Sequence, residues 1–235
     1  MKENELKLSE YELNFSFKRG FLPWIRKKKK QWLFEILRNQ IKVFKPDVIY
    51  SMAIETIDNN FLKSVKDYYR LAIGQHAASL NHGNISEYDL ILSSLPNQVK
   101  YFRNNGIESR LFKLGFEPKI LDKLKKGEKK HDIVFIGGFG KDFGNSTKLI
   151  ERLLQNFDFK IWGYFHKSLS EQSIIRKKNN GVSYGKNMYQ TLMDSKIVFN
   201  RHADFAETYA NNMRLYQSTG VGSFLLTDQK DNLND

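Results

Sequence analysis

The sequence predicts an α/β protein built from two doubly wound parallel-sheet domains, each of them incomplete. Short apolar runs alternate with stretches of helical periodicity along most of the chain. The runs are apolar throughout instead of alternating with polar residues, as strands covered on both faces of a parallel sheet require. Hydrophobic residues make up 40 % and aromatic residues 14 % of the 235 residues, which is enough apolar material for a packed core.

The first half is predicted to open on a helix and to continue through four strands. Leu33, Leu37, Ile41 and Phe44 recur at helical spacing, and Pro46 follows the last of them closely enough to end the helix. Apolar runs then predict strands at 47–51, 70–74, 89–94 and 109–116. Helices are expected between them at 60–69 and 96–106, the second beginning with a proline.

A charged connector at 118–130 separates this half from a second one in which the same order of elements restarts. Strands are predicted at 131–136, 159–165, 196–200 and 223–228, with helices at 146–157, 187–195 and 212–220. Ser146 is the expected N-cap of the first of these helices. We therefore divide the chain into a basic segment (1–45), a partial first domain (46–117), a linker (118–130) and a second domain (131–235). Because the first half opens on a helix and the second stops after a strand, we expect truncation at both ends.

Composition excludes several classes of site. The chain has no cysteine, so disulfides, thiolate zinc sites and a cysteine nucleophile are ruled out. It contains no D-x-D pair, H-E-x-x-H or G-x-S-x-G motif, and we therefore expect neither a bound metal nor a serine nucleophile. The N-terminus lacks an apolar leader, and no run approaches the roughly 18 apolar residues of a membrane helix. These features favour a cytoplasmic protein.

The net charge of +12 is concentrated in two windows. Residues 18–45 hold ten basic side chains against one acid, and residues 119–130 hold six against two. Such surfaces attract nucleic acid, anionic lipid or polyanionic substrates without distinguishing among them. A solvated helix face and a solvated linker are the alternative explanations.

Candidate site residues are those that directly follow predicted strands, because ligands bind beyond the carboxyl ends of parallel strands. In the first half, His76 lies just past a strand and between small residues. An imidazole there can act as a general base or stabilise a developing charge. The alternative is a histidine that only fills the strand end.

In the second half, Gly137, Gly138 and Gly140 follow the first strand and allow a ligand to approach the backbone. Their spacing matches neither the dinucleotide fingerprint nor a Walker loop. A helix N-terminus just beyond them would supply amides for an anion. A glycine-rich turn alone remains a weak signal.

A later strand is followed by Arg201 and His202, and Asn212 precedes a helix that carries Arg214 and Gln217. Together with the neighbouring Asn211, these residues provide cations, amides and a positive helix end. That combination can hold a diphosphate. An asparagine N-cap with surface arginines is the alternative.

At this point the sequence resembles a known family. The stretch MYQTLMDSKIVFNRHADFAETYANNMRLYQSTGVGSFLLTD (188–228) is similar to the spore-maturation CgeB-like glycosyltransferases, which belong to the glycosyl transferases group 1 and to the GT-B class with two Rossmann-like domains. Residues 95–118 and 132–140 resemble the end of that family's first domain and the opening of its second. The resemblance spans about residues 46–235.

This resemblance implies metal-independent transfer of a hexose-like sugar, without a cofactor, from a nucleotide-diphosphate sugar to a cell-envelope or spore-surface polysaccharide or glycoconjugate. The second domain would hold the donor and the first the acceptor, with His76 close to the transferred sugar. Arg214 and the amides near Asn212 would face the phosphates. Gln217 stands where the class commonly has a glutamate that binds the ribose, and an amide is the weaker acceptor.

Three further hypotheses follow from the positions at which the chain departs from the family pattern and from its charge. A non-catalytic nucleotide-sugar or glycan-binding remnant is the main alternative, because of Gln217 and the missing ends. The basic N-terminal window would suit peripheral contact with an anionic membrane at its inner face. A nucleic-acid binder ranks well below these, because only charge and aromatics such as Trp24 and Trp32 suggest it.

Overall fold

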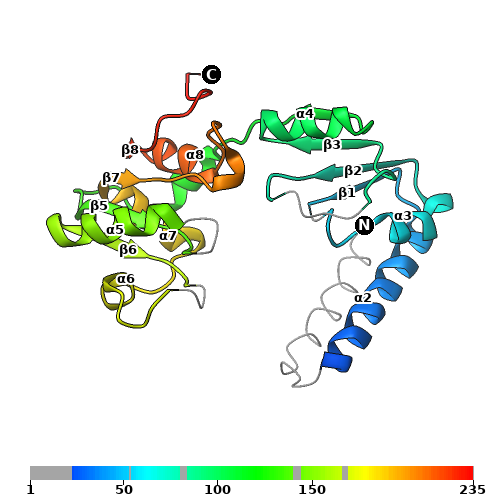
Figure 1. Ribbon diagram of the computed structural model, residues 1–235, viewed down its shortest axis with the longest axis horizontal. Helices are drawn as coiled ribbons and strands as arrows, with labels where there is room; N and C mark the ends of the chain where they lie inside the picture. Colours follow the sequence, from blue (N-terminus) through cyan, green and yellow to red (C-terminus); the bar gives the residue numbers. More distant parts are fainter. Residues whose placement is uncertain (1–22, 53, 80–83, 140–143, 166–168, 235) are drawn as a thin grey trace.

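A computed structural model describes residues 23–52, 54–79, 84–139, 144–165 and 169–234. It has two α/β lobes joined by the segment that follows β4, and α2 (Pro23–Phe44) extends from the first lobe (Figure 1). Each lobe contains a sheet of four parallel strands, as the sequence predicts. Among the described residues, no helix is long and apolar enough to cross a membrane.

The first sheet has the order β1-β2-β3-β4, so every connection steps to the next strand in one direction. Its strands are β1 (Val48–Ser51), β2 (Leu71–Gln75), β3 (Leu90–Ser93) and β4 (Ser109–Leu111). Right-handed crossovers in a single direction place all the connecting helices on one face. In agreement, α2, α3 (Asn59–Ser64) and α4 (Pro96–Asn104) all contribute to one core with Ile49, Ala72 and Ile91. A short 3₁₀ helix, η2 (Lys66–Tyr68), follows α3.

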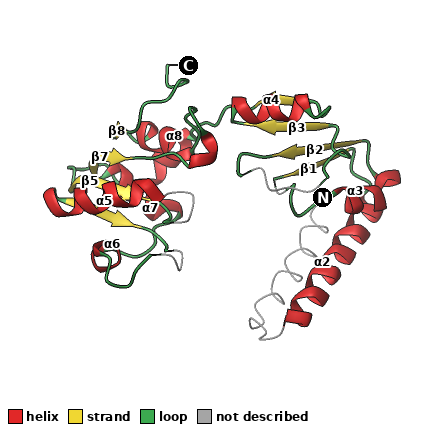
Figure 2. Cartoon of the chain, in the orientation of Figure 1, coloured by secondary structure: helices red, strands yellow, loops and turns green. Residues whose placement is uncertain are grey.

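The second sheet has the order β6-β5-β7-β8, which reverses direction between β5 and β7. The strands are β5 (His131–Ile136), β6 (Phe159–Trp162), β7 (Ser195–Phe199) and β8 (Phe224–Leu226). α5 (Gly144–Asn156) and α6 (Ile174–Lys178) cover one face through a core that includes Phe135 and Ile161. α7 (Gly185–Met193) and α8 (Met213–Gly220) lie on the opposite face, whose core includes Val134, Leu192 and Val221 (Figure 2).

The charged connector packs against the second lobe. It contains a 3₁₀ helix, η3 (Pro118–Lys123), and Leu124 is buried in the same core as Leu192. The side chain of Gln190 accepts a hydrogen bond from the backbone N–H of Lys125 at 2.8 Å and donates one to its carbonyl at 2.9 Å. The lysine-rich connector is therefore held against the second lobe by the buried Leu124 and by hydrogen bonds from its backbone.

Several element ends differ from the sequence-based expectation. β4 stops at Leu111 instead of 116, and β6 stops at Trp162 instead of 165. The next residue, Gly163, donates its backbone N–H to the carbonyl of Gly181. α5 begins at Gly144, so Ser146 lies inside the helix and is not its N-cap. α2 ends at Phe44, two residues before Pro46, as expected, and Lys45 follows it with a φ of 49°.

Candidate functional site

The carboxyl edge of the second sheet brings together residues from β5 and β7 at the point where the strand order reverses. Arg201, two residues after β7, donates from Nη2 to the carbonyl oxygen of Gly138 at 2.8 Å. Its guanidinium also lies 5.0 and 5.1 Å from the ring centroids of Phe135 and Phe139. Burial lowers the Arg201 pKa to about 10, which leaves the side chain charged at neutral pH.

Arg214, in the first turn of α8, reaches across to the end of β5. Its Nη2 donates to the carbonyl oxygen of Ile136 at 3.0 Å, and its Nη1 donates to Oε1 of Gln217 at 2.8 Å. Within the described part of the chain its Nε has no hydrogen-bond partner. Burial lowers the Arg214 pKa to about 10, so this cation also persists at neutral pH.

The orientation of the Gln217 amide follows from its two neighbours. Its oxygen accepts from Arg214, and its Nε2 donates to the hydroxyl of Tyr189 at 3.3 Å. A carboxylate at this position would accept from both partners and would neutralise part of the Arg214 charge. The amide instead leaves the guanidinium with its full charge.

Asn212 is the N-cap of α8 and also ties the helix to the end of β7. Its Oδ1 accepts from the backbone N–H of Leu215 at 3.3 Å. Its Nδ2 donates to Oδ1 of Asn200 and to the carbonyl of Arg201, both at 2.9 Å. The side chain that the sequence associates with a ligand therefore fixes where the positive end of α8 points.

His202 is buried, with 5 % of its surface exposed. Its Nδ1 accepts a hydrogen bond from the backbone N–H of Asn211 at 3.1 Å, which places the ring proton on Nε2. Nε2 lies 3.3 Å from the hydroxyl of Thr227. Burial lowers the His202 pKa, so we assign the neutral ring at pH 7.

A cavity of about 190 Å³ opens beside Arg214 at the ends of β5 and β6, and we call it the glycine cavity. Its lining includes three glycines, three aromatic side chains and one cation: Gly137, Gly138, Gly163, Trp162, Tyr164, Tyr184 and Arg214. Flat apolar surfaces beside a guanidinium and exposed backbone are suited to a nucleoside phosphate.

A second cavity of about 560 Å³ lies at the ends of β7 and β8, on the side of the sheet covered by α5. Arg201 and His202 line this cavity, together with Asp204, Asp228 and Lys230. The predicted site residues of the second lobe thus line two neighbouring cavities instead of one. Gly137, Gly138 and Arg214 line the first, Gln217 contacts Arg214, and Gly140 lies outside the described residues.

In the first lobe, His76 directly follows β2 and only 3 % of its surface is exposed. Its Nδ1 lies 2.9 Å from a carboxylate oxygen of Glu55, and its Nε2 lies 3.1 Å from the carbonyl oxygen of Ala78. The ring meets Phe102 edge to face, with 6.0 Å between centroids. His76 is therefore at the predicted strand end, but packed beneath the surface.

Sequence reasoning missed Glu55, Gly163 and Tyr164. Gly163 and Tyr164 follow β6, so the rule that selected residues after strands would have found them had the strand been ended at Trp162. Glu55 carried no local signal, because it lies in a loop four residues after β1. Among the described residues, no group of three or more histidine, aspartate or glutamate side chains is placed to hold a metal ion.

Comparison with known proteins gives a partial match and a shared fold. Residues 146–235 match a family model described as glycosyl transferase-like. No curated protein matches the sequence. A glycosyltransferase from Rickettsia africae has a similar structure, with a TM-score of 0.54 and 12 % identity over 93 % of this chain and 66 % of that one. Anabaena Alr3699/HepE, determined in complex with UDP and glucose, gives a TM-score of 0.56 and 11 % identity over 92 % and 67 %.

The chain thus spans about two thirds of the length of these two proteins. The arrangement of two parallel four-stranded sheets with flanking helices resembles their GT-B fold, which confirms the predicted fold class. The family match covers most of α5 and all that follows it, including β7, α8 and the two arginines. It supports a transferase.

Proposed function

We propose that the protein is a glycosyltransferase that takes a sugar from a nucleotide-diphosphate donor. The observation that carries this proposal is Arg214, a half-buried cation that faces the glycine cavity from the first turn of α8 and has no carboxylate within hydrogen-bonding distance among the described residues. Helix N-termini and guanidinium groups are the protein groups that best hold phosphate oxygens. The family match to residues 146–235 supports the same assignment.

The donor would lie with its diphosphate against Arg214 and the backbone of Gly138, and with its base against Trp162, Tyr164 or Tyr184. A glycine is needed at Gly138, because an added Cβ would lie only 2.5 to 2.9 Å from side-chain atoms of Tyr164. Such a Cβ would fill the space between the Gly138 backbone and Tyr164. UDP is the first nucleotide to test, because the Anabaena protein was determined with UDP and glucose.

Catalysis would depend on stabilising the departing nucleoside diphosphate. The bond from the anomeric carbon to the diphosphate oxygen breaks, and the diphosphate leaves with the electron pair. Arg214 would take up this charge directly, and Arg201 and the α8 N-terminus would contribute their field. These groups supply positive charge without a metal ion, so we propose a metal-independent reaction.

The acceptor would bind the first lobe, whose β2 and β3 arrowheads point toward the second lobe in Figure 2. We propose a polysaccharide or glycoconjugate of the cell envelope or spore surface, after the CgeB-like resemblance of residues 188–228. The basic N-terminal window suits peripheral contact with an anionic membrane from the cytoplasmic side. Co-sedimentation with phosphatidylglycerol vesicles at low salt, but not with phosphatidylcholine vesicles, is the expected result.

Calorimetric titration with UDP, GDP, ADP, TDP and CMP tests the donor site. One diphosphate should bind selectively, with the same affinity in the presence of EDTA. Arg214→Gln should weaken that binding about tenfold or more, since a charge-assisted phosphate contact is lost. The matched control is Arg152→Gln, an exposed arginine on α5, which should leave the affinity unchanged.

A non-catalytic nucleotide-sugar binder is the second candidate, and the amide at Gln217 favours it. A protein that binds one diphosphate tightly, yet neither hydrolyses nor transfers from the corresponding nucleotide sugar, would support this function. If no nucleotide binds to the folded protein, the donor-site assignment is wrong.

A further inference from the structure

The loop after β1 places Glu55 directly over His76. Nδ1 of His76 and Oε1 of Glu55 are 2.9 Å apart, yet the two side chains differ sharply in access to solvent. The His76 side chain is 2 % exposed, whereas that of Glu55 is 43 % exposed. Of this pair, only the carboxylate can meet a ligand without rearrangement of the fold.

His76 is held by contacts on every side. Its backbone N–H donates to the carbonyl of Leu92 at 2.9 Å, and its ring packs edge-on against Phe102. Both ring nitrogens face oxygen acceptors, Glu55 on one side and the Ala78 carbonyl on the other. A hydrogen bond donated from Nδ1 orients the Glu55 carboxylate.

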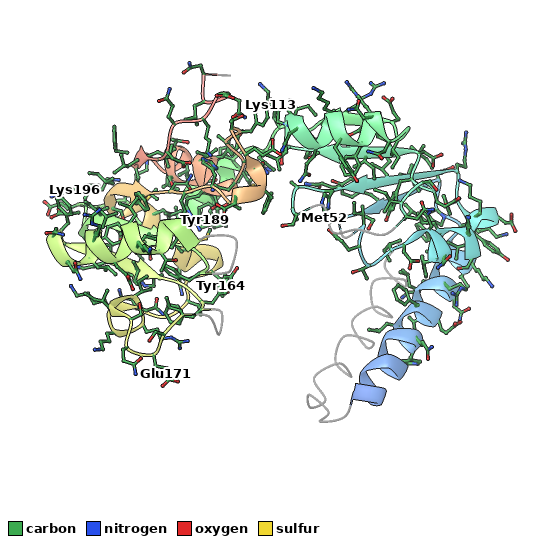
Figure 3. All side chains as sticks on the ribbon, viewed as in Figure 1. Met52, Lys113, Tyr164, Glu171, Tyr189 and Lys196 are labelled. Carbon is green, nitrogen blue, oxygen red and sulfur yellow. The ribbon has the colours of Figure 1, made fainter. Side chains whose placement is uncertain are left out.

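The pair lies at the edge of the first sheet where an acceptor would be expected. β1 and β2 are in register with Ser51 opposite Gly74, so the loop carrying Glu55 and the residue after β2 emerge at the same carboxyl edge. Met52, at the start of that loop, lies on the side of the first lobe that faces the second lobe (Figure 3). Tyr164 lies on the side of the second lobe that faces the first. Ligands of open parallel sheets bind at this edge.

Other titratable groups around Glu55 are already engaged. Asp58 caps α3 by accepting from the backbone N–H of Phe61 at 2.9 Å. The hydroxyl of Tyr88 donates to the carbonyl of Ile57 at 2.7 Å, and that of Tyr50 donates to Gln75. Glu55 is therefore the carboxylate of this loop that is both oriented by a histidine and accessible to solvent.

We propose that Glu55 is the catalytic base of the transfer and that His76 is its positioning residue; this inference rests on the proposed glycosyltransferase function. The Glu55 carboxylate accepts the proton of the acceptor hydroxyl while that oxygen forms its bond to the anomeric carbon. The bond from this carbon to the diphosphate oxygen breaks, and the diphosphate leaves with the electron pair. Direct displacement of this kind inverts the anomeric configuration.

The test uses the α-glucose esters of UDP, GDP, ADP and TDP with water as the acceptor, and compares Glu55→Gln with Glu108→Gln. Glu108 is an exposed carboxylate of the same lobe paired with Arg110, next to β4, and serves as the matched control. We expect Glu55→Gln to lower kcat by about 10²-fold or more, the usual contribution of a general base. Diphosphate affinity and thermal unfolding should match those of the wild-type protein, and Glu108→Gln should leave all three unchanged.

Three readouts separate chemistry from a structural role. The acidic limb of the wild-type pH-rate profile should be absent in Glu55→Gln and present in His76→Gln. Added formate should restore part of the turnover of Glu55→Ala, because a free carboxylate can replace the missing base. Proton NMR recorded before mutarotation should show β-glucose as the first product.

The possible failures have different meanings. Unchanged kcat in Glu55→Gln, or retained configuration, overturns the role of Glu55 and leaves the glycosyltransferase assignment in place. Diphosphate binding without any turnover by the wild-type chain also overturns it. Absence of diphosphate binding overturns both the assignment of the donor site and the role of Glu55 as the base.

Discussion

Nη2 of Arg201 donates a 2.8 Å hydrogen bond to the carbonyl oxygen of Gly138, and this bond joins the ends of β7 and β5. These two strands are the neighbours between which the order of the second sheet reverses. Helices therefore depart to opposite faces on either side of the bond, and an opening is left at the sheet edge. A buried cation thus fixes one wall of the glycine cavity.

Replacing Arg201 should loosen this wall. Arg201→Met retains apolar contact with Phe135 and Phe139 but removes the hydrogen bond and the cation. We expect the free energy of unfolding to fall by about 2 kcal/mol, the range for a hydrogen bond to a charged group. Urea denaturation provides the measurement. Lys196→Met, which breaks the exposed pair with Asp132, should leave the free energy of unfolding almost unchanged, because water screens an exposed ion pair.

Gly163 should tolerate no side chain. A Cβ at this position would lie 2.2 Å from the carbonyl oxygen of Gly137, which is backbone and has no rotamer to change. Gly163→Ala should therefore displace the loop after β5, lower the melting temperature and weaken diphosphate binding. Gly127→Ala is the control, since a Cβ there would meet nothing within 4 Å. Equal melting temperatures for the two variants would mean that the backbone at Gly137 moves aside without cost.

The stability of the protein should fall as the pH drops below about 6.5, and His202 should cause part of this fall. Burial lowers its pKa in the folded state, so below the unfolded value of about 6.5 the unfolded chain binds more protons. A single such group gives at most about 1.4 kcal/mol per pH unit. Stability is fully present above the unfolded pKa and declines toward the lower folded pKa.

Urea denaturation between pH 7.5 and 5 compares the wild type with His202→Gln. The variant should show a shallower loss of stability with falling pH. Some dependence should remain, because burial and Lys160 also lower the pKa of His131. Identical pH slopes in the two proteins would exclude His202 as the cause.

Gln217→Glu should stabilise the fold by placing a carboxylate beside Arg214. The present amide oxygen lies 2.8 Å from Nη1, and a charged acceptor roughly doubles the strength of such a bond. We expect a gain of about 1 kcal/mol at pH 7. A paired glutamate has a lowered folded pKa, so the gain should disappear as the pH falls below about 4. Increased sugar transfer by this variant would indicate descent from an active enzyme.

Local pattern was sufficient for most of the secondary structure. Unbroken apolar runs predicted each of the eight strands found among the described residues, because a strand buried on both faces needs apolar neighbours along its own length. Asn212 was correctly placed before α8, since an N-cap is a contact within one helical turn. Strand ends were less accurate. β6 ends where Gly163 bonds to Gly181, a partner 18 residues away that local periodicity does not encode.

The sequence by itself determined two parallel α/β lobes and the strand ends at which ligand-binding side chains could lie, because both depend on residues adjacent in the chain. Only the tertiary structure decided which of those side chains meet. It joined Arg201 to Gly138 across 63 positions, separated Arg201 from Arg214 into neighbouring cavities, and buried His76 beneath Glu55. Such contacts depend on the order of strands and on which helix covers which face, and these are set by packing of the whole lobe.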